Sequence, residues 1–359
     1  MKSIFVVSNM FPSRKHPFYG IFVKNFIDGF RSEKLLRVKN TALIKGKKSN
    51  SLKKLIAYSY LSVKIILKGA LFNHDIIYVH YLKYTTFSTF FIKLIKPKVK
   101  LVYNVHGSDI LDNDSSSIKI NAFKQRVLNS CDAIVVPSNY FAEIFRTNFP
   151  QFNSKLFISP SGGIDEKLFF KDKHNITKNQ FIIGYIGRID KGKGIETLLK
   201  ATELIESKNI DFRVDIVGSG ALEDRLKKEL NDEIKTKIRF HGAKPQRDLR
   251  RFYNNFDIFV FPSERLNESL GLVGLESMAC GTPVIGSSIG EIKNYIKDGY
   301  NGYLFNPKDY NMLAEKLLYF NGLNNTEKDQ LSSNAIELSK KYGNQTVHNK
   351  LSNFLINLK

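Results

Sequence analysis

The sequence predicts an α/β protein with two Rossmann-like domains, each built on a doubly wound parallel sheet. Short apolar runs of strand length alternate with longer segments of helical spacing along the whole chain, and this alternation is typical of parallel sheets that helices cover on both faces. With 359 residues, 42% of them hydrophobic, the chain can form two separate cores. We therefore expect two domains whose strand-end loops face each other across a cleft.

The first domain begins with a strand at residues 3–8, and a helical pattern follows from Ile21. Later apolar runs predict strands at 75–80, 100–105, 132–137 and 155–159. Sheets of this kind bind ligands in the loops beyond the carboxyl ends of their strands, so these loops are the places to examine.

Gly20 and His106 are the first two candidates. Gly20 precedes the first helix, where a backbone without Cβ could approach a phosphate; an ordinary turn glycine is the alternative. His106 follows the strand at 100–105 and is itself followed by Gly107 and Asp109. A histidine at a strand end is either a ligand contact or a structural residue, and the sequence leaves both open.

The second domain repeats the alternation. Its predicted strands are 181–186, 212–217, 237–240, 257–261 and 283–286. The loop after the first of them reads GRIDKGKG, and it joins Gly187, Arg188 and Lys193 just before a helix. Such a loop suits an anion, most naturally a diphosphate, with a solvated basic loop as the alternative. It contains neither a P-loop nor a G-x-G-x-x-G pattern.

A helix flanked by turn residues follows the fourth of these strands. Ser269 is the expected N-cap of a helix from about 270 to 279, and Gly281 takes the position just after its end. Glu268 then lies on the preceding loop, and Glu276 lies within the helix.

The spacing of these two carboxylates suggests a shared direction. At about 100° per residue, Glu268 and Glu276 lie within about 80° of one face. Both could then face a ligand together with the free N–H groups of Gly271 and Leu272. A buried carboxylate needs hydrogen-bond partners, and the hydroxyls of a sugar or ribose would serve. The alternative is a core helix with a surface glutamate.

The remaining composition excludes several classes of protein. Cys131 and Cys280 lie in apolar surroundings typical of buried thiols, so neither a disulfide framework nor a metal site is expected. No segment reaches the roughly 18 consecutive apolar residues that span a bilayer, and the first apolar run is too short for a signal peptide. We therefore expect a cytoplasmic protein.

The net charge of +21 lies mainly in residues 1–100, which hold 20 Lys and Arg against three acidic residues. Two stretches there, 51–70 and 81–100, mix cations with large apolar residues, and the first has the spacing of a helix that lies in a membrane interface. A nucleic-acid-binding protein is a remote alternative, because no helix-turn-helix, RRM, KH or zinc signature is present. We expect docking on the anionic inner leaflet, with a solvated basic surface as the alternative.

Seven motifs spread over the chain form a set. They are YGIFVKNF, VHGSD and SPSGGIDEKLF in the first half, and GRIDKGKG, VGSG, FHGAKPQRDLRRFYNNFDIFVFPS and ESLGLVGLESMACGTPV in the second. Together they resemble the retaining glycosyltransferases of the GT-B fold, in particular family 4 with its E-x7-E motif. The resemblance implies an acceptor-binding domain at 1–165, to which a C-terminal helix at about 342–359 returns, and a domain for the nucleotide-sugar donor at 166–341.

The resemblance also assigns residues to the site. Catalytic roles fall to His106, Arg188, Lys193 and Glu268. Contacts with the sugar donor fall to Gly20, Gly187, His241, Gly242, Leu270, Gly271, Leu272 and Glu276. Gly20 would lie beside the distal phosphate, His106 beside the donor sugar, and Asp109 on the acceptor side.

Within this set, four residues divide the substrate between them. Arg188 and Lys193 neutralise the diphosphate, Glu276 holds the ribose hydroxyls, and Glu268 contacts the hydroxyls of the transferred sugar. The base lies by His241 and its neighbouring glycine. All of these roles are inherited from the resemblance.

The chain departs from the family pattern in three places. Gly20 stands alone where the family often has two glycines, Leu270 replaces a common Phe, and IGEIKN occurs where the family usually has G-G-x-P-E. These changes leave the diphosphate and ribose roles in place and the donor sugar open.

The reaction that the resemblance implies is a retaining, metal-independent transfer of a hexose from a nucleotide diphosphate sugar. A UDP-sugar is expected first and GDP-mannose next, with a lipid-linked or envelope-polysaccharide acceptor and no other cofactor. Fixed cations and a helix dipole would stabilise the charge on the departing phosphate. A GT-B-fold epimerase or a non-catalytic relative is the alternative.

Overall fold

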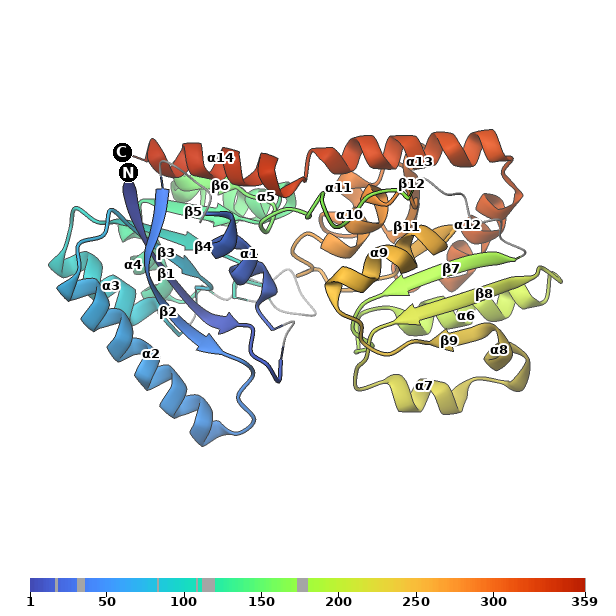
Figure 1. The fold of residues 1–359 in the computed structure, drawn as a ribbon, viewed down its shortest axis with the longest axis horizontal. Helices are drawn as coiled ribbons and strands as arrows, with labels where there is room; N and C mark the ends of the chain where they lie inside the picture. Colours follow the sequence, from blue (N-terminus) through green and yellow to red (C-terminus); the bar gives the residue numbers. More distant parts are fainter. Residues whose placement is uncertain are drawn as a thin grey trace. The chain divides into compact units, whose positions relative to one another are not determined.

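The computed structural model describes residues 1–16, 19–30, 36–82, 84–107, 109–111, 120–172 and 180–358. The chain divides into two compact units, which Figure 1 shows. Unit 1 contains Met1–Gly163 and Asn344–Lys359, and unit 2 contains Ile164–Gly343. Each unit has its own sheet and its own hydrophobic core.

Unit 1 is a six-stranded sheet of parallel strands in the order β2-β1-β3-β4-β5-β6. The strands are β1 (Lys2–Phe11), β2 (Leu36–Lys45), β3 (Ile76–His80), β4 (Lys100–Asn104), β5 (Ala133–Val136) and β6 (Leu156–Ile158). The helices are α1 (Ile21–Gly29), α2 (Ser51–Leu71), α3 (Thr86–Ile95), α4 (Ala122–Ser130), α5 (Asn139–Asn148), the 3-10 helix η1 (Pro150–Lys155) and α14 (Asn344–Ile356).

Side chains that alternate along these buried strands form two cores, one on each face of the sheet. Helices α2 to α5 pack on one face, and α1 and α14 pack on the other. The C-terminal helix is fixed to this unit by Phe354, whose ring stacks on Phe157 with 4.1 Å between centroids. Lys2 Nζ also donates to the carbonyl oxygen of Ile356 at 2.5 Å.

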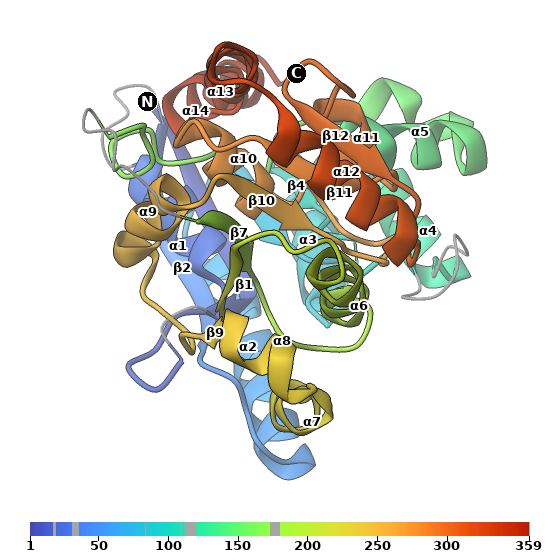
Figure 2. The same ribbon diagram turned by 90° about the vertical axis from the view of Figure 1, so that its right-hand side faces the viewer.

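Unit 2 repeats the architecture with the strand order β12-β11-β10-β7-β8-β9, again parallel. The strands are β7 (Phe181–Ile186), β8 (Phe212–Val217), β9 (Ile238–Phe240), β10 (Ile258–Phe261), β11 (Val284–Ser287) and β12 (Gly302–Phe305). The helices are α6 (Ile195–Glu206), α7 (Glu223–Glu229), α8 (Asp232–Lys237), α9 (Gln246–Asn255), α10 (Leu272–Ala279), α11 (Ile292–Tyr295), α12 (Tyr310–Gly322) and α13 (Asn325–Lys340). Figure 2 shows α6 and α12 on one side of this sheet and α9, α10 and α13 on the other.

Both sheets have a point where the direction of winding changes. In unit 1, α1 follows β1 and α3 follows β3, and the two helices lie on opposite faces. In unit 2, α6 follows β7 and α10 follows β10, again on opposite faces. The loops that leave the two neighbouring strands run to opposite faces of the sheet, so a crevice opens between them. Open α/β sheets bind ligands at such points. We call the loops after β1 and β3 the first switch point, and the loops after β7 and β10 the second.

The predicted pair of doubly wound parallel sheets is confirmed. Strands β2 and β12 were not predicted from the sequence. Both are edge strands, and β2 alternates between buried and partly exposed residues while β12 has only four residues. Partial exposure weakens the apolar pattern of β2, and the four residues of β12 are too few to form a clear pattern. No described helix is both long and apolar enough to cross a membrane.

Candidate functional site

Three glycines lie just beyond neighbouring strands of the second sheet, beginning with the loop after β7 at the second switch point. Gly187, Gly218 and Gly242 lie near the ends of β7, β8 and β9. The N–H of Gly187 donates to Val217 O at 3.0 Å, and that of Gly218 donates to Gly242 O at 3.0 Å. A Cβ on Gly218 would lie 1.8 Å from Gly187 O, so only glycine permits this approach. The predicted residues Gly187 and Gly242 are therefore brought together through Gly218, which has no predicted role.

Lys193 and Glu268 form an ion pair at this switch point. Lys193 Nζ lies 2.6 Å from Glu268 Oε2, and Ser263 Oγ donates to the same oxygen at 2.9 Å. Each charged side chain is only 16% exposed. Burial alone would raise the pKa of Glu268, but the Lys193 ammonium and the Ser263 hydroxyl outweigh burial and lower it. Two residues predicted to serve different parts of the substrate therefore lie in contact, with Glu268 ionised at neutral pH.

The loop between β7 and α6 depends on Gly194, the N-cap of α6. Its φ is +71°, and a Cβ there would lie 1.7 Å from Pro262 O. The neighbouring Gly192 O accepts a hydrogen bond from Glu264 N at 2.9 Å. The first N–H groups of a helix have no partner within the helix. Helix α6 therefore presents these groups and its positive dipole end close to Lys193.

Arg188 lies in the same loop and is largely exposed to solvent. Its Nη1 lies 2.9 Å from Asp190 Oδ2, and its side chain is 64% exposed. The other oxygen of Asp190 accepts from Ala221 N at 3.0 Å. Asp190 thus fixes the loop and leaves Arg188 accessible to an anion, whereas Lys193 is largely buried.

The helix of the E-x7-E segment begins later than predicted. Gly271, with φ +76°, is the N-cap of α10, and no side chain caps this helix. The predicted N-cap Ser269 is therefore wrong, because the left-handed conformation of Gly271 interrupts any right-handed helix that starts earlier. Glu268 lies on the loop before the helix, as predicted, so the angle of about 100° per residue does not describe its direction relative to Glu276.

The residues around the start of α10 divide between core and surface. Leu270 is 1% exposed and belongs to the core beneath α10. Leu272 is the first residue of the helix and is partly exposed. The N–H groups of Leu272 and Val273 have no partner within the helix, so they can bind an anion or a carbonyl.

Glu276 lies inside α10 and is 5% exposed. Tyr253 OH donates to Glu276 Oε2 at 3.0 Å, and Gln246 Nε2 donates to Oε1 at 3.2 Å. Burial raises the pKa of Glu276 to about 7, although both hydrogen bonds lower it. The carboxyl group is therefore divided between its protonated and ionised forms near neutral pH. Neither Tyr253 nor Gln246, both on α9, was predicted, because no local spacing links them to Glu276.

His241 follows β9 and is oriented by Asp215. His241 Nε2 lies 2.9 Å from Asp215 Oδ1, and Arg213 Nη2 donates to the other oxygen at 3.0 Å. The imidazole edge packs against Phe252 with 5.0 Å between centroids. The side chain is 28% exposed, so the ring is fixed and yet accessible.

In unit 1, Gly20 and His106 meet through Phe22. Gly20 is the N-cap of α1 with φ +75°, and a Cβ there would lie 2.6 Å from the carbonyl carbon of Met10. Phe22, in the first turn of α1, packs against the His106 ring with 4.6 Å between centroids. The two predicted residues therefore lie at the same edge of the first sheet.

His106 is hydrogen-bonded to His80, a residue without a predicted role. His80 Nδ1 lies 3.1 Å from His106 Nε2, and the rings stack with 5.3 Å between centroids. Burial lowers the pKa of His106 to about 3 and the pKa of His80 well below its usual value. Both imidazoles are therefore neutral at neutral pH, and one donates to the other. His80 ends a buried strand, and nothing nearby in the sequence marks it.

Asp109 braces the loop that carries His106. Its Oδ1 accepts from His106 N and its Oδ2 from Leu82 N, both at 2.9 Å. The residue is 2% exposed, and burial raises the pKa of Asp109 while the backbone N–H groups oppose that rise. Both oxygens are engaged by backbone, so the structure shows a positioning contact, and the acceptor-side role stays a prediction.

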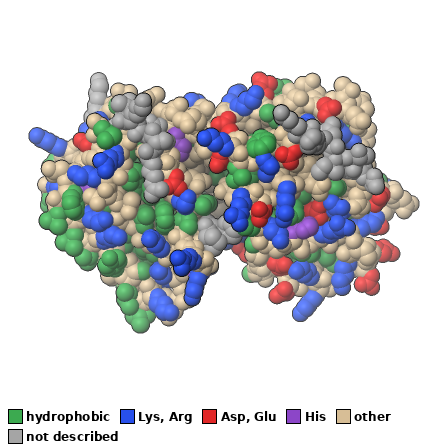
Figure 3. Space-filling view, in the orientation of Figure 1, with side chains coloured by type: hydrophobic (Ala, Val, Ile, Leu, Met, Phe, Trp, Pro, Cys, Tyr) green, Lys and Arg blue, Asp and Glu red, His purple; other side chains and the backbone are tan. Residues whose placement is uncertain are grey.

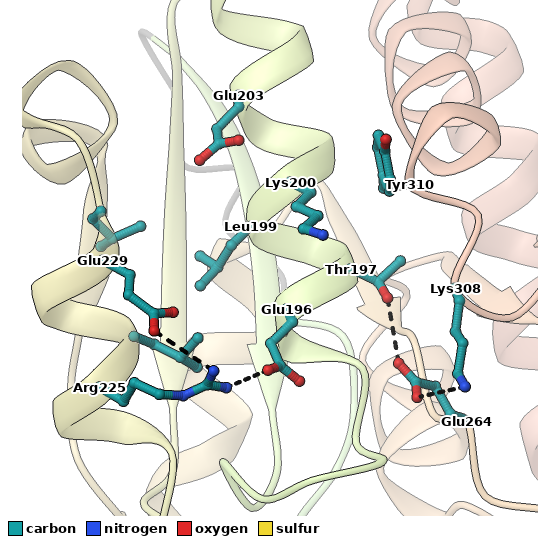
Figure 4. A pocket seen from close by; sticks show the side chains of 12 residues that line it. Glu196, Thr197, Leu199, Lys200, Glu203, Arg225, Glu229, Glu264, Lys308 and Tyr310 are labelled. Atoms are coloured by element: carbon teal, nitrogen blue, oxygen red, sulfur yellow. Dashed lines mark hydrogen bonds and ion pairs between the residues drawn. The ribbon is translucent and has the colours of Figure 1, made fainter.

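A separate pocket of about 510 Å³ in unit 2 lies beside α6 and α7, and none of the predicted site residues lines it. Figure 4 shows that Arg225 pairs with Glu196 and Glu229, and that Lys308 faces Glu264. These ion pairs hold most of the charged side chains of the pocket against one another. Among the residues that the structure describes, no group of three or more His, Cys, Asp or Glu side chains is placed to hold a metal ion.

Comparisons with known proteins agree with this arrangement. The capsular polysaccharide biosynthesis glycosyltransferase CapM of Staphylococcus aureus is 28% identical over 195 residues, which cover 52% of this chain and 51% of CapM. The lipopolysaccharide 1,2-N-acetylglucosaminetransferase of Salmonella typhimurium is 28% identical over 222 residues, 58% of this chain and 54% of that protein. The chain thus spans about half the length of these curated relatives.

The fold and the family are shown by a solved structure and by two family models. Anabaena HepE, crystallised with UDP and glucose, matches with a TM-score of 0.72 and 19% identity over 99% of both chains, a likeness of fold. Residues 20–162 match the model described as Glycosyltransferase Family 4, and residues 166–338 match the one described as Glycosyl transferases group 1. The chain therefore belongs to the GT-B glycosyltransferases and is of the family 4 type.

Proposed function

We propose that this chain transfers a hexose from a nucleotide diphosphate sugar to a glycan acceptor, with retention of configuration at the transferred carbon. The observation that carries the proposal is the second switch point, where Lys193 and Glu268 pair beside the helices capped by Gly194 and Gly271. Fixed cations and helix N-termini can carry the diphosphate charge, so no metal ion is needed. A UDP-sugar is the first candidate, supported by the UDP and glucose in the HepE structure, and GDP-mannose is the next.

In this proposal four residues share the sugar donor. Lys193 and Arg188 bind the diphosphate, Glu276 binds the ribose hydroxyls, and Glu268 binds hydroxyls of the transferred sugar. Negative charge builds on the phosphate as its bond to the sugar breaks, and the cations stabilise this charge more than they stabilise the ground state. Lys193 begins in an ion pair with Glu268, so the bound diphosphate has to share the ammonium with that carboxylate.

The acceptor reacts on the face from which the phosphate departs. The acceptor hydroxyl oxygen forms its bond to the sugar carbon as the bond to the phosphate breaks, and its proton passes to the departing phosphate. Glu268 is left free to bind sugar hydroxyls and forms no covalent intermediate. His106, neutral and held by His80, is assigned to hydrogen-bond to the transferred sugar, and Gly20 is assigned to the distal phosphate.

A thermal-shift screen with UDP-, GDP- and ADP-sugars tests the nucleotide. A ligand that binds only the native state raises stability by RT ln(1 + [L]/Kd). We expect UDP-sugars to raise the midpoint most in wild type and much less in Glu276→Ala. A screen in which no nucleotide sugar shifts the wild-type midpoint would contradict the proposal.

We further propose that unit 1 docks on the inner face of an anionic membrane and that the acceptor is lipid-linked or an envelope polysaccharide. Large apolar side chains cover the outer surfaces of α2 and α3: Leu52, Leu55, Ile56, Tyr60, Val63, Leu67, Leu71, Phe87, Phe91, Leu94 and Ile95, all 39% to 75% exposed. Neither helix contains Asp or Glu, and Lys53 and Lys54 are exposed at the start of α2. Figure 3 shows apolar and basic side chains gathered over these helices.

Large apolar side chains among solvated cations are typical of a surface that lies in an anionic membrane interface. The names of the two curated relatives, in capsule and lipopolysaccharide synthesis, also favour an envelope acceptor.

Sedimentation with phosphatidylglycerol vesicles and with phosphatidylcholine vesicles measures the docking. We expect binding to the anionic vesicles to fall in Leu55→Ser/Leu67→Ser and in Lys53→Ser/Lys54→Ser. The exposed lysines of unit 2 give the control, Lys228→Ser/Lys235→Ser. Equal binding by all variants, or equal binding to both vesicle types at low salt, would contradict docking.

A further inference from the structure

The first switch point brings together neutral polar and aromatic groups to which no role has been given. Asn9 lies near the end of β1, Tyr84 lies between β3 and α3, and Tyr58 lies on α2. These three segments are far apart in the sequence and meet at the carboxyl edge of the first sheet. This is the position where the topology of an open parallel sheet places a ligand.

Asn9 carries the first sign of a missing partner. The residue is 9% exposed, and its Nδ2 donates to Tyr58 OH at 3.3 Å. Its Oδ1 is buried and accepts no hydrogen bond from any residue that the structure describes. A buried carbonyl oxygen without a partner is unfavourable, so this position suits a ligand that brings its own hydroxyl donor.

Two tyrosine rings provide the second sign. The rings of Tyr58 and Tyr84 lie 4.3 Å apart between centroids, tilted by 39°. Tyr84 is 53% exposed, although its ring is held against Tyr58. Burial raises the pKa of Tyr58 and of the nearby Tyr19, so both phenols are neutral hydrogen-bonding groups. The result is an exposed aromatic surface with hydroxyl and amide groups at its edge.

We propose that Asn9, Tyr58 and Tyr84 form the subsite for a pyranose ring of the acceptor. A pyranose has apolar C–H faces and peripheral hydroxyls, and an aromatic ring with a neighbouring amide complements both. The C–H face packs on Tyr84, and a hydroxyl of the sugar donates to Asn9 Oδ1. This inference rests on the proposed glycosyl transfer, because it names the side that receives the sugar.

The surroundings connect this subsite with the other residues of unit 1. Gly20 packs against the backbone of Met10, the residue after Asn9. Tyr81, just after β3, packs against His106 with 4.6 Å between centroids. The chain segments that carry Asn9 and Tyr84 therefore contact Gly20 and His106, the two residues assigned to the sugar donor in this unit. Tyr58 also lies on α2, the helix whose exposed side carries the apolar surface, so a lipid-linked sugar would reach the subsite along the same helix.

Saturation-transfer NMR tests the subsite on the full chain. The probes are methyl glucoside, methyl galactoside and methyl N-acetylglucosaminide. We expect wild type to transfer saturation to the ring C–H protons of at least one probe. We expect the signal to fall about fivefold in Tyr84→Ala, because the apolar face of the sugar loses the ring on which it packs. Tyr84→Phe keeps the ring and should keep the signal, and Asn9→Ala should weaken it.

The matched control is Tyr319→Ala in unit 2, where Tyr319 is 59% exposed. Equal signals from wild type and Tyr84→Ala, or no signal from wild type with any of the three probes, would overturn the subsite. Loss of vesicle binding in Tyr84→Ala without loss of glycoside signal would assign the ring to the membrane surface instead. UDP-induced thermal shifts in the same variants distinguish a failure of the subsite from a failure of the proposed function. Tyr84 lies in unit 1 and the proposed UDP site lies in unit 2, so Tyr84→Ala should leave these shifts unchanged.

Discussion

The two switch points share a topology and differ in chemistry. At the second, opposite charges meet, since Lys193 and Glu268 pair with each side chain 16% exposed. At the first, neutral groups meet, namely Asn9, Tyr58 and Tyr84. A breaking bond to a diphosphate needs fixed charge, whereas a sugar acceptor needs an apolar surface and hydrogen bonds. Topology therefore determines where a site lies, and the side chains there determine what it binds.

The largest expected effect concerns the charged switch point. Lys193→Met should lower turnover by about 10²-fold or more, because the ammonium acts on charge that develops as the phosphate departs. Arg188→Ala should act in the same direction by a similar factor. Turnover with a nucleotide-sugar donor and circular dichroism measure activity and folding separately.

Lys191→Met, an exposed lysine of the same loop, is the control and should keep its activity. Lys193→Met also leaves Glu268 buried without its cation, which costs stability. The double variant Lys193→Met/Glu268→Gln should therefore regain stability without regaining turnover. Near-normal rates in both Lys193→Met and Arg188→Ala would show that the diphosphate lies elsewhere.

The next effect separates the two carboxylates of the same switch point. Glu276→Ala should weaken UDP binding by roughly 1–3 kcal/mol, because hydrogen bonds from ribose hydroxyls to a charged group are lost. Glu268→Ala should lower the rate of transfer more than it lowers the affinity for UDP. Calorimetric titration of both variants with UDP gives the comparison. Similar losses of UDP affinity in the two variants would contradict the assignment of Glu276 to the ribose and Glu268 to the transferred sugar.

A smaller effect follows from the raised pKa of Glu276. The folded pKa of about 7 lies above the ordinary value of 4.5, so the folded protein holds this proton more tightly than the unfolded chain. The stability that Glu276 contributes is therefore complete below about pH 4.5 and is lost as the pH rises to about 7. Relative to Glu276→Gln, wild type should lose at most about 1.4 kcal/mol per pH unit in this window. Urea unfolding at pH 5, 6, 7 and 8 measures the difference in free energy of unfolding between the two proteins. A difference that does not depend on pH would contradict the raised pKa of Glu276.

The smallest effect compares two glycines of unit 2. Both have positive φ, but a Cβ on Gly194 would meet Pro262 O at 1.7 Å, whereas a Cβ on Gly242 meets nothing within 4 Å. Gly242→Ala should therefore cost only the strain of the left-handed conformation, about 1 kcal/mol, and Gly194→Ala should cost more. Unfolding midpoints of the two variants check this order. Equal costs would mean that the backbone contact of Gly194 does not hold the anion loop in shape.

The local patterns predicted the central strands and the glycine-rich loop after β7 because each depends on neighbouring residues. Strand β2 was missed because many of its residues are partly exposed, and β12 was missed because it is a strand of only four residues that begins with Gly302. The start of α10 was misplaced because Ser269 has the chemistry of an N-cap, and only the backbone conformation of Gly271 shows where the helix begins.

The contacts that define the site were beyond local prediction. Lys193 and Glu268 are 75 residues apart in the chain, so their pairing follows from the order of the strands. His80 was missed for the same reason, since its contact with His106 joins the ends of neighbouring strands. Motif resemblance could name the residues of the site, and the fold was needed to show which of them touch.

Hydrogen exchange with and without saturating UDP tests the central claim, that the nucleotide binds at the charged switch point. We expect protection to be greatest in the peptides covering residues 187–194 and 263–276, where Lys193, Glu268 and Glu276 lie. The peptides around Asn9 and Tyr84 should change less. Protection confined to those peptides of unit 1, with none at the loops after β7 and β10, would contradict the account.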